Sequence, residues 1–445
     1  MQLVAYGAQD IYLTGNPQIT FFKVVYRRHT NFSMEAVKQT FNGTEDFGGS
    51  VSATISRNGD LLYRMYLEHD VRVTAASADS ENAIMANYGS RLMKECELEI
   101  GGQKIDKHYG HWHSVYSQLT ELNPTGNVGG GVADSFPDTK NSNSTLFNYM
   151  SGNGKGFRTK TNSARVNVSN GWTSTSLETS ANGHLGGRFF IPLYFWFCRN
   201  PGLALPLIAL QYHEVKVKMT FEDKNKLFGE DAVADLGSGA ITAGTGNATG
   251  SDGTGSPTFD LWCDYIYLDT DERRRFAQVS HEYLIEQLQY SSFSGETTMD
   301  INFNHPVKEL IWSGQPTTNG QASGTLGADL DEGTEAYSES LLSAGTWQLK
   351  LNGHDRFKER DFKYFTRTQI WEHHTGYGGS VIKDSIGVYS FALKPEEHQP
   401  SGTCNFSRID NAQLVQTASD KINLYAVNYN VLRIMSGMGG LAYSN

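Results

Sequence analysis

Apolar and polar residues alternate one by one over many short stretches of this chain. In residues 214–221 (EVKVKMTF) every second residue is apolar, and most of the residues between them are charged. The same alternation occurs in residues 96–100, 348–351 and 425–431. A period of two is typical of antiparallel strands that pack one face on a core. The pattern therefore predicts an all-β protein.

A helical spacing is clear in one place only. From Tyr109 onward the residues Trp112, Val115 and Leu119 fall on one face of a helix with 3.6 residues per turn, and Pro124 follows. This spacing predicts one amphipathic helix that ends before the proline.

The second half of the chain repeats the first. Residues 98–105 (LEIGGQKI) are echoed by residues 349–356 (LKLNGHDR), and we expect the two segments to lie on equivalent strands. Four weaker matches occur in the same order along the chain. They are residues 27–28 and 35 with 274–275 and 282, residues 61–66 (LLYRMY) with 307–312 (VKELIW), residues 191–197 (IPLYFWF) with 386–392 (IGVYSFA), and residues 261–268 (LWCDYIYL) with 424–431 (LYAVNYNV).

Segments rich in Gly, Ser, Thr and Asn interrupt the repeat, and we interpret them as long surface loops. The repeat then predicts two sandwiches of about eight strands each, the usual number for a jelly roll. A pair of immunoglobulin-like sandwiches is the alternative, and two copies are too few for a propeller. The predicted organisation is an N-terminal arm at 1–19, a first jelly roll at 20–275 with insertions near 123–187 and 235–257, a second jelly roll at 276–436 with a loop near 313–345, and a tail at 437–445.

Composition narrows the function. The net charge of −11 over 445 residues argues against wrapping of nucleic acid, which needs a dense basic face. The four cysteines, too sparse for a disulfide framework, predict reduced thiols. The N-terminus has no signal-peptide pattern, and the apolar stretch at 189–197 is too short to span a bilayer. We therefore expect a soluble chain that is not secreted.

No catalytic, cofactor or metal site is predicted. His108 and His111 would share a helix face near His113, but a metal site needs a further ligand, and His373 and His374 would point apart in a strand. The sequence has no H-E-x-x-H, P-loop or G-x-S-x-G motif, and the acidic pairs, such as those at 45–46 and 396–397, are interpreted as solvated loop ends. The arginines at 273–275 are placed at the connection between the domains, where they would fix the angle between the sandwiches.

Long motifs cover the whole strand framework and carry a family resemblance. They include TGNPQITFFKVVYRR (14–28), LEIGGQKIDKHY (98–109), NPGLALPLIALQYHEVK (200–216), HEYLIEQLQ (281–289), PSGTCNFSRIDNA (400–412) and NYNVLRIMSGMGGLAY (428–443). With these motifs the chain resembles the major capsid proteins of large icosahedral double-stranded DNA viruses of the nucleocytoplasmic type, in particular those of algal phycodnaviruses such as the chloroviruses.

The resemblance implies a tandem double jelly roll that acts as a structural protein and not as an enzyme. Three copies would form a pseudo-hexagonal homotrimer that tiles an icosahedral shell, with the long loops outward and the termini inward. The implied partners are the chain itself, neighbouring capsomers, and minor capsid and penton proteins, close to an internal virion membrane and without direct contact to nucleic acid. Assembly would take place in the host cytoplasm.

Two further expectations concern carbohydrate. Asn-x-Ser/Thr sequons occur at Asn143, Asn167 and Asn247 in the predicted outer loops, and also at Asn31, Asn42 and Asn405. The capsid proteins that this chain resembles are glycosylated, often away from such sequons, so these three sites are candidates. An alternative function is a carbohydrate-binding or carbohydrate-cleaving jelly-roll protein, which an exposed aromatic residue such as Trp172 would permit.

Overall fold

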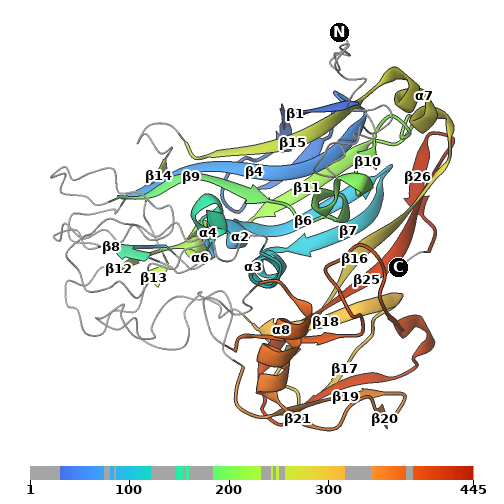
Figure 1. Cartoon of the computed structure of the whole chain (residues 1–445). Coiled ribbons are helices and arrows are strands. Elements are labelled where there is room, and N and C mark those ends of the chain that lie inside the picture. Colours follow the sequence, from blue (N-terminus) through green and yellow to red (C-terminus); the bar gives the residue numbers. More distant parts are fainter. Residues whose placement is uncertain are drawn as a thin grey trace, which may run out of the picture.

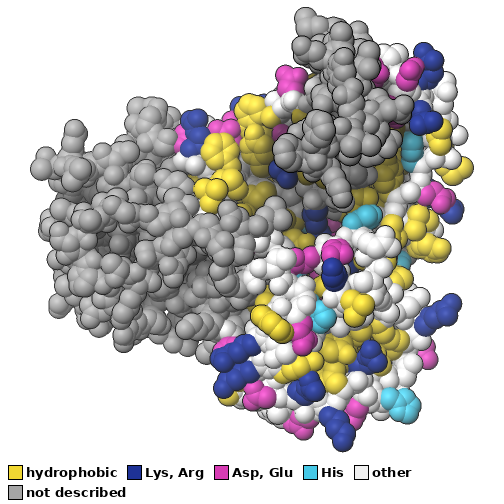
Figure 2. Space-filling model, viewed as in Figure 1, with side chains coloured by type: hydrophobic (Ala, Val, Ile, Leu, Met, Phe, Trp, Pro, Cys, Tyr) yellow, Lys and Arg dark blue, Asp and Glu magenta, His cyan; other side chains and the backbone are white. Residues whose placement is uncertain are grey.

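Two β-sandwiches lie one below the other in the computed structural model of the chain (Figure 1). The structure describes residues 31–74, 81–84, 87–121, 146–153, 157–159, 184–231, 242–243, 247–249, 256–315, 342–376 and 384–443. On the face seen in Figure 2, acidic and basic side chains of the described residues are interspersed, and no extended basic surface is visible among them.

The first sandwich consists of two antiparallel sheets. One contains β1 (Phe32–Gln39), β15 (Thr258–Leu268), β4 (Leu61–Thr74) and β9 (His184–Pro192) in that order, with the short strands β10 (Leu205–Pro206) and β14 (Asn247–Thr249) also on β4. The facing sheet has the order β2 (Phe41–Gly43), β3 (Ser50–Thr54), β11 (Val215–Phe221), β6 (Met93–Ile100) and β7 (Gln103–Tyr109). A small sheet of β13 (Thr242–Ala243), β12 (Phe228–Asp231), β5 (Glu81–Ile84) and β8 (Phe157–Thr159) lies at one side of this sandwich.

The second sandwich repeats this plan. Its first sheet has the order β16 (His281–Ser294), β25 (Lys421–Met435), β18 (Pro306–Gly314) and β22 (Ile386–Ser390), with β23 (Cys404–Asn405) on β18 and β26 (Met438–Leu441) on β25. The facing sheet has the order β17 (Thr298–Asp300), β24 (Ala412–Gln416), β19 (Thr346–Leu351) and β20 (His354–Asp355), with β21 (Arg360–Asp361) on β19. In both sandwiches the main strands, numbered along the chain, pair as first–eighth–third–sixth and second–seventh–fourth–fifth, which is the jelly-roll order.

The strongest repeat match is confirmed to the residue. Ile100 pairs with Gln103 across the turn between β6 and β7, and Leu351 pairs with His354 across the turn between β19 and β20. The two turn residues have positive φ in both hairpins, 59° and 82° in Gly101–Gly102 and 51° and 77° at residues 352–353. Two successive left-handed residues match the twist of the strands that they join, so both copies use the same tight turn.

Three of the weaker repeat matches are wrong in register. Tyr66 pairs with Trp262 in the first sandwich, as Ile311 pairs with Tyr425 in the second. Trp262 and Tyr425 occupy equivalent positions in the two sandwiches, so their partners Tyr66 and Ile311 are equivalent as well. The sequence match instead aligns Tyr66 with Trp312. A shift of one residue moves a side chain to the other face of a sheet, and Trp312 lies in the core while Ile311 faces outward.

The same reasoning corrects the other two matches. Pro192 pairs with Tyr66 and therefore corresponds to Val388, the partner of Ile311, one residue beyond the sequence match. Glu35 pairs with Tyr265, and the equivalent pair in the second sandwich is Gln287 with Asn428, so the predicted match to Glu282 is wrong. The arginines at 27–28 lie outside the described residues.

The predicted amphipathic helix is confirmed as α3 (Gly110–Leu119). The other short helices are α2 (Tyr88–Leu92), α4 (Leu146–Ser151), α5 (Trp196–Arg199), η3 (Pro201–Leu203), α6 (Lys224–Leu227), α7 (Thr270–Gln278), η4 (Tyr364–Thr368), α8 (Gln369–His373) and η5 (Phe406–Arg408). The segments predicted as long surface loops contain the short elements α4, β8, β13 and β14. These elements are too short for a periodic signal and are held by β9, β5, β12 and β4.

Each sandwich has its own aromatic-rich core between its two sheets. Phe189, Phe221 and Tyr265 are among the fully buried residues of the first core. In the second core Trp312 and Trp347 pack with ring centroids 5.4 Å apart. Burial of such large apolar side chains is the main stabilising term for each sandwich.

Candidate functional site at the junction of the two sandwiches

The helix α3 joins the two sandwiches. It follows β7 of the first sandwich directly and packs on the outer face of the sheet β16–β25–β18–β22 of the second (Figure 1). The ring of Trp112 lies 5.1 Å from that of Tyr425. The buried apolar residues of this junction are Trp112, Val115, Tyr116 and Leu119 from α3, Ile311, Ile386, Val388, Tyr425 and Val427 from the sheet, and Ile370 from α8.

The long strands β16 and β25 form a second connection. They pair over their whole length, from His281 with Ile434 to Ser294 with Lys421. The two paired strands form one ribbon, and one of its ends belongs to the core of the second sandwich. The core of the first sandwich includes three residues near the other end, Ile285, Leu432 and Ile434. One pair of strands therefore contributes to both cores.

The C-terminal hairpin extends this contact. β26 lies in the segment predicted as a tail, and Nδ1 of His213 in the first sandwich lies 2.9 Å from the carbonyl oxygen and 3.1 Å from the backbone nitrogen of its Gly439. A Cβ at Gly439 would lie 2.7 Å from Cδ2 of Leu210, so the absence of a side chain allows the close approach.

A buried cluster of charges crosses the junction. Arg199 of α5 forms an ion pair with Glu286 of β16, and Nζ of Lys308 on β18 lies 2.8 Å from the other oxygen of that carboxylate. Arg199 also donates two hydrogen bonds to the carbonyl oxygen of Tyr194 and lies 4.6 Å from the ring centroid of Tyr116. Burial alone would raise the pKa of Glu286, but Lys308 and Arg199 outweigh it and lower this pKa below its ordinary value.

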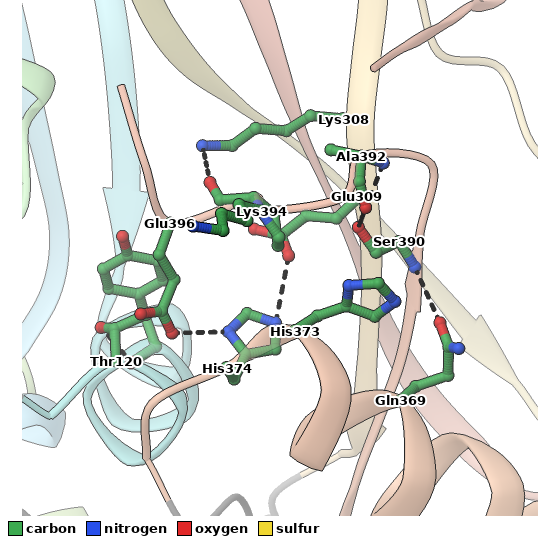
Figure 3. Close-up of polar contacts among 12 residues, drawn as sticks. Thr120, Lys308, Glu309, Gln369, His373, His374, Ser390, Ala392, Lys394 and Glu396 are labelled. Carbon is green, nitrogen blue, oxygen red and sulfur yellow. Dashed lines mark hydrogen bonds and ion pairs between the residues drawn. The ribbon is translucent and has the colours of Figure 1, made fainter. Parts of the chain in front are cut away.

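A buried histidine forms a second polar cluster next to the first (Figure 3). Nε2 of His374 lies 3.1 Å from the carboxylate of Glu309, and Nδ1 lies 2.9 Å from that of Glu396. Burial lowers the pKa of His374, but the two carboxylates outweigh this effect and raise it to about 9. His374 is therefore an imidazolium at neutral pH.

This second cluster is tied to the first sandwich through the backbone. Glu396 accepts hydrogen bonds from both the backbone N–H and the hydroxyl of Thr375. The N–H of the next residue, Gly376, donates to the carbonyl oxygen of Leu119 at the end of α3 at 2.8 Å. Glu396 was predicted to be a solvated loop end, and that prediction is wrong because the fold brings it onto His374.

The other histidine predictions are also corrected. His108 lies in β7 and not on the helix, because α3 begins at Gly110, so His108 and His111 share no helix face. His108 pairs with Asp106 at 2.9 Å, whereas His111 contacts the hydroxyl of Tyr425 at 2.7 Å. His373 ends α8 and does not lie in a strand. Within the described ranges no group of three or more His, Cys, Asp or Glu residues is arranged to hold a metal ion.

Asp106 adds a further connection across the junction. Its carboxylate accepts a hydrogen bond at 3.0 Å from the backbone N–H of Leu288 on β16. The side chain of the neighbouring Gln287 donates to the carbonyl oxygen of Ile105 on β7. The junction is therefore apolar at α3 and polar along β7 and β16.

The arginines at 273–275 lie in α7, between β15 and β16, as predicted. Nε of Arg273 lies 2.9 Å from the carboxylate of Asp60, which also accepts the backbone N–H of Leu268. This contact fixes the start of α7 against the end of β15. All four cysteines are free, and Cys96, Cys198 and Cys263 are buried in the first sandwich.

Comparison with known proteins identifies the family. The family model described as the N-terminus of the major capsid protein matches residues 20–269, and the model described as the large eukaryotic DNA virus major capsid protein matches residues 272–440. The major capsid protein of Pyramimonas orientalis virus is 47% identical over 468 residues, covering 100% of this chain and 99% of the relative. That of Paramecium bursaria Chlorella virus 1 is 40% identical over 498 residues, with the same coverage. The chain belongs to the major capsid proteins of large eukaryotic DNA viruses.

A solved structure supports the same conclusion. The quasi-atomic model of the PBCV-1 virus capsid matches with a TM-score of 0.68 at 36% identity, over 96% of this chain and 100% of that chain. This major capsid protein is thus a structural component of the virion with a double jelly-roll fold, and it is not an enzyme. The part of the capsid protein that the structure describes contains no helix that is long and apolar enough to cross a membrane.

The candidate glycosylation sites fall mostly outside the described part of the capsid protein. Asn143 and Asn167 lie outside the described residues. Asn247 begins the short strand β14 and pairs with Thr74, so it lies in a strand and not in the predicted loop.

Sequence reasoning missed the charge cluster around Glu286. One signal was present in the capsid protein sequence, because Lys308 and Glu309 stand inside a strand that is otherwise apolar, and both are buried. Charged residues at such positions are almost always paired.

Proposed function

We propose that this major capsid protein forms homotrimeric, pseudo-hexagonal capsomers that tile an icosahedral shell. The observation that supports this proposal is the pair of sandwiches with the same strand order, held together in one chain by the buried junction. Three copies contain six similar sandwiches, which form the six corners of a capsomer. A closed threefold oligomer can therefore pack among its neighbours with nearly sixfold symmetry. Such an arrangement requires a fixed angle between the two sandwiches of each chain, which the buried junction supplies.

We also propose the partners and the location that the family resemblance implies. Capsomers would contact neighbouring capsomers, minor capsid proteins and penton proteins, on the outer side of an internal membrane. The net charge of −11 supports a role without direct contact to nucleic acid. Assembly would take place in the host cytoplasm, without secretion.

Glycosylation at Asn143, Asn167 and Asn247 remains a prediction. Peptide mapping of protein purified from virions, with the mass of each sequon peptide measured before and after removal of glycans, tests it. Unmodified peptides at all three positions would contradict it. The carbohydrate-binding alternative was permitted by exposed aromatic residues such as Trp172, which lies outside the described residues. Glycan turnover or monomeric behaviour in solution would support it, and a stable trimer without glycan affinity would contradict it.

Light scattering coupled to size exclusion tests the trimer. We expect a species with three times the mass of the chain, and larger sheets at higher concentration. A monomer at all concentrations would contradict self-association without another protein.

A further inference from the structure

The contact of α3 with the second sandwich has a counterpart on the first sandwich, a face that the described residues leave partly exposed. The corrected register assigns the covered residues Ile311 and Tyr425 to Tyr66 and Trp262 on the outer face of β4 and β15. Ile386 corresponds likewise to Phe190 on β9. Ile311, Tyr425 and Ile386 are fully buried under α3, whereas Phe190 is 36% exposed and Tyr66 and Trp262 are half-buried.

Tyr66, Trp262 and Phe190 form a continuous aromatic strip across three neighbouring strands. The rings of Tyr66 and Trp262 are stacked with centroids 6.4 Å apart, and Phe190 meets Tyr66 edge to face at 6.1 Å. Figure 2 shows hydrophobic side chains at the surface over the region where Figure 1 draws β15, β4 and β9. Aromatic rings arranged in this way supply large contact areas at protein interfaces.

A carboxylate stands beside the strip. Asp264 occupies the position of Val427, which α3 covers in the second sandwich. In the described part of the chain Asp264 has no ion pair, whereas Glu68 and Asp260 on the same face lie next to Arg188 and Lys38. Arg64 on the adjacent strand offsets part of the effect of burial on the pKa of Asp264, so a partner that covers this face needs aromatic surface and can add a further cation beside Asp264.

The second sandwich carries the counterpart of α3. The strand pairs next to the two helical segments, Glu95 with Tyr109 and Thr346 with Asp361, place Leu119 opposite Trp371, so η4 and α8 follow β21 as α3 follows β7. On the same register Val115 and Leu119, which face the neighbouring sheet, correspond to Arg367 and Trp371.

Lys363, Arg367 and Trp371 follow one another at intervals of four residues and are all exposed. Trp371 is 82% exposed, and Arg367 forms an ion pair with Asp384 at 2.6 Å. This stripe offers an exposed aromatic ring and two cationic side chains to the aromatic and acidic face around Trp262.

We propose that the stripe of Lys363, Arg367 and Trp371 in one copy docks on the strip of Tyr66, Trp262 and Phe190 in the next copy. This inference rests on the proposed self-association and names its contact. The contact repeats between chains the one that α3 makes within a chain. It joins two different surfaces, so each copy has one of each, and such head-to-tail contacts close into a ring when the rotation allows.

Two single variants test the contact, Trp371→Asp on the helical stripe and Tyr66→Asp on the aromatic strip. The matched control is Tyr212→Asp, because Tyr212 is 75% exposed and lies elsewhere, next to Gly437. Light scattering of each variant should show a trimer dissociation constant raised by at least about tenfold for the two interface variants and unchanged for the control. Circular dichroism and the melting temperature of each variant establish that it is folded.

Mixing the two interface variants gives the sharper result. Trp371→Asp retains an intact aromatic strip and Tyr66→Asp retains an intact helical stripe, so together they should form one-to-one dimers that neither forms alone. Folded variants that trimerise like the unaltered protein would overturn the inference and leave the proposed trimer standing. Failure of the mixture to dimerise would also overturn it. An unaltered protein that is monomeric would instead contradict the proposed function.

Discussion

His374 and Glu309 form an ion pair in which the two side chains are almost completely buried, with nitrogen and oxygen 3.1 Å apart. Glu309 lies on β18, and His374 follows α8, next to the residues that contact the end of α3. The pair therefore belongs both to the second sandwich and to its junction with the first, and its protonation state affects both.

Stability should fall as the pH rises through about 9. The pKa of His374 is raised from its ordinary 6.5 to about 9 in the folded chain, so its contribution is fully present below 6.5 and is lost as the pH passes through about 9. The difference between these two pKa values of His374 corresponds to a stabilisation of the folded protein by at most about 3 kcal/mol. Urea unfolding between pH 6 and 10 measures it, and His374→Gln should remove most of this dependence. An unchanged slope in that variant would show that other groups are responsible.

Replacement of Glu286 by glutamine should destabilise the protein by about 3–5 kcal/mol, because the buried Lys308 and the partly buried Arg199 would lose their carboxylate. Glu282→Gln is the control on the same strand, since Glu282 pairs with Arg433 at the exposed surface and should cost at most about 1 kcal/mol. Chemical denaturation of both variants gives the comparison. Equal losses would show that burial of the pair is unimportant.

Gly439→Ala should loosen the C-terminal hairpin at a cost of about 1–3 kcal/mol, since the new methyl group would meet Leu210 and Ile100. Gly440→Ala is the control, because its nearest neighbour is the flexible end of Gln103 at 3.3 Å. Hydrogen exchange of the β26 amides should accelerate in the first variant only. Protection that stays the same in both would contradict the close packing described for Gly439.

Replacement of Trp112 by alanine should lower the stability of the protein, whereas replacement of Trp371 should leave its stability almost unchanged. Trp112→Ala removes a fully buried ring at the junction and should cost about 3–5 kcal/mol, measured by thermal or denaturant unfolding. Trp371→Ala removes an exposed ring and should change the stability of the monomer by no more than about 0.5 kcal/mol. A large loss of stability in the second variant would mean that Trp371 packs within its own chain.

The sequence predicted the architecture well because strands, turns and repeats are local features. The hairpin at Gly101 and its counterpart at Asn352 follow from a turn that needs two left-handed residues. Register between distant strands was predicted less well. The bulges near Asp264 in β15 and Lys308 in β18 lie at equivalent positions and do not account for these errors. The matched segments are short and apolar on both faces, so a shift of one residue leaves their composition almost unchanged while it moves every side chain to the other face.

The junction could not be predicted for a related reason. Arg199, Glu286 and Lys308 are distant in sequence, and each looks like an ordinary polar residue among its neighbours. Only the packing of α3 and the course of β16 bring them together. His374 was noticed for its possible role as a metal ligand, but its carboxylate partners come from β18 and from the loop after β22, which no local pattern connects.

The ribbon of β16 and β25 has a consequence for how this protein folds. Because Ile285 and Leu432 complete the first core while the other end of the same strands completes the second, neither core can close until the ribbon has paired. Opening of one sandwich therefore exposes apolar surface in the other, and the two should unfold in one cooperative transition. A subunit made in this way cannot be divided at the boundary between its halves, and it enters assembly with the angle between its two corners already fixed.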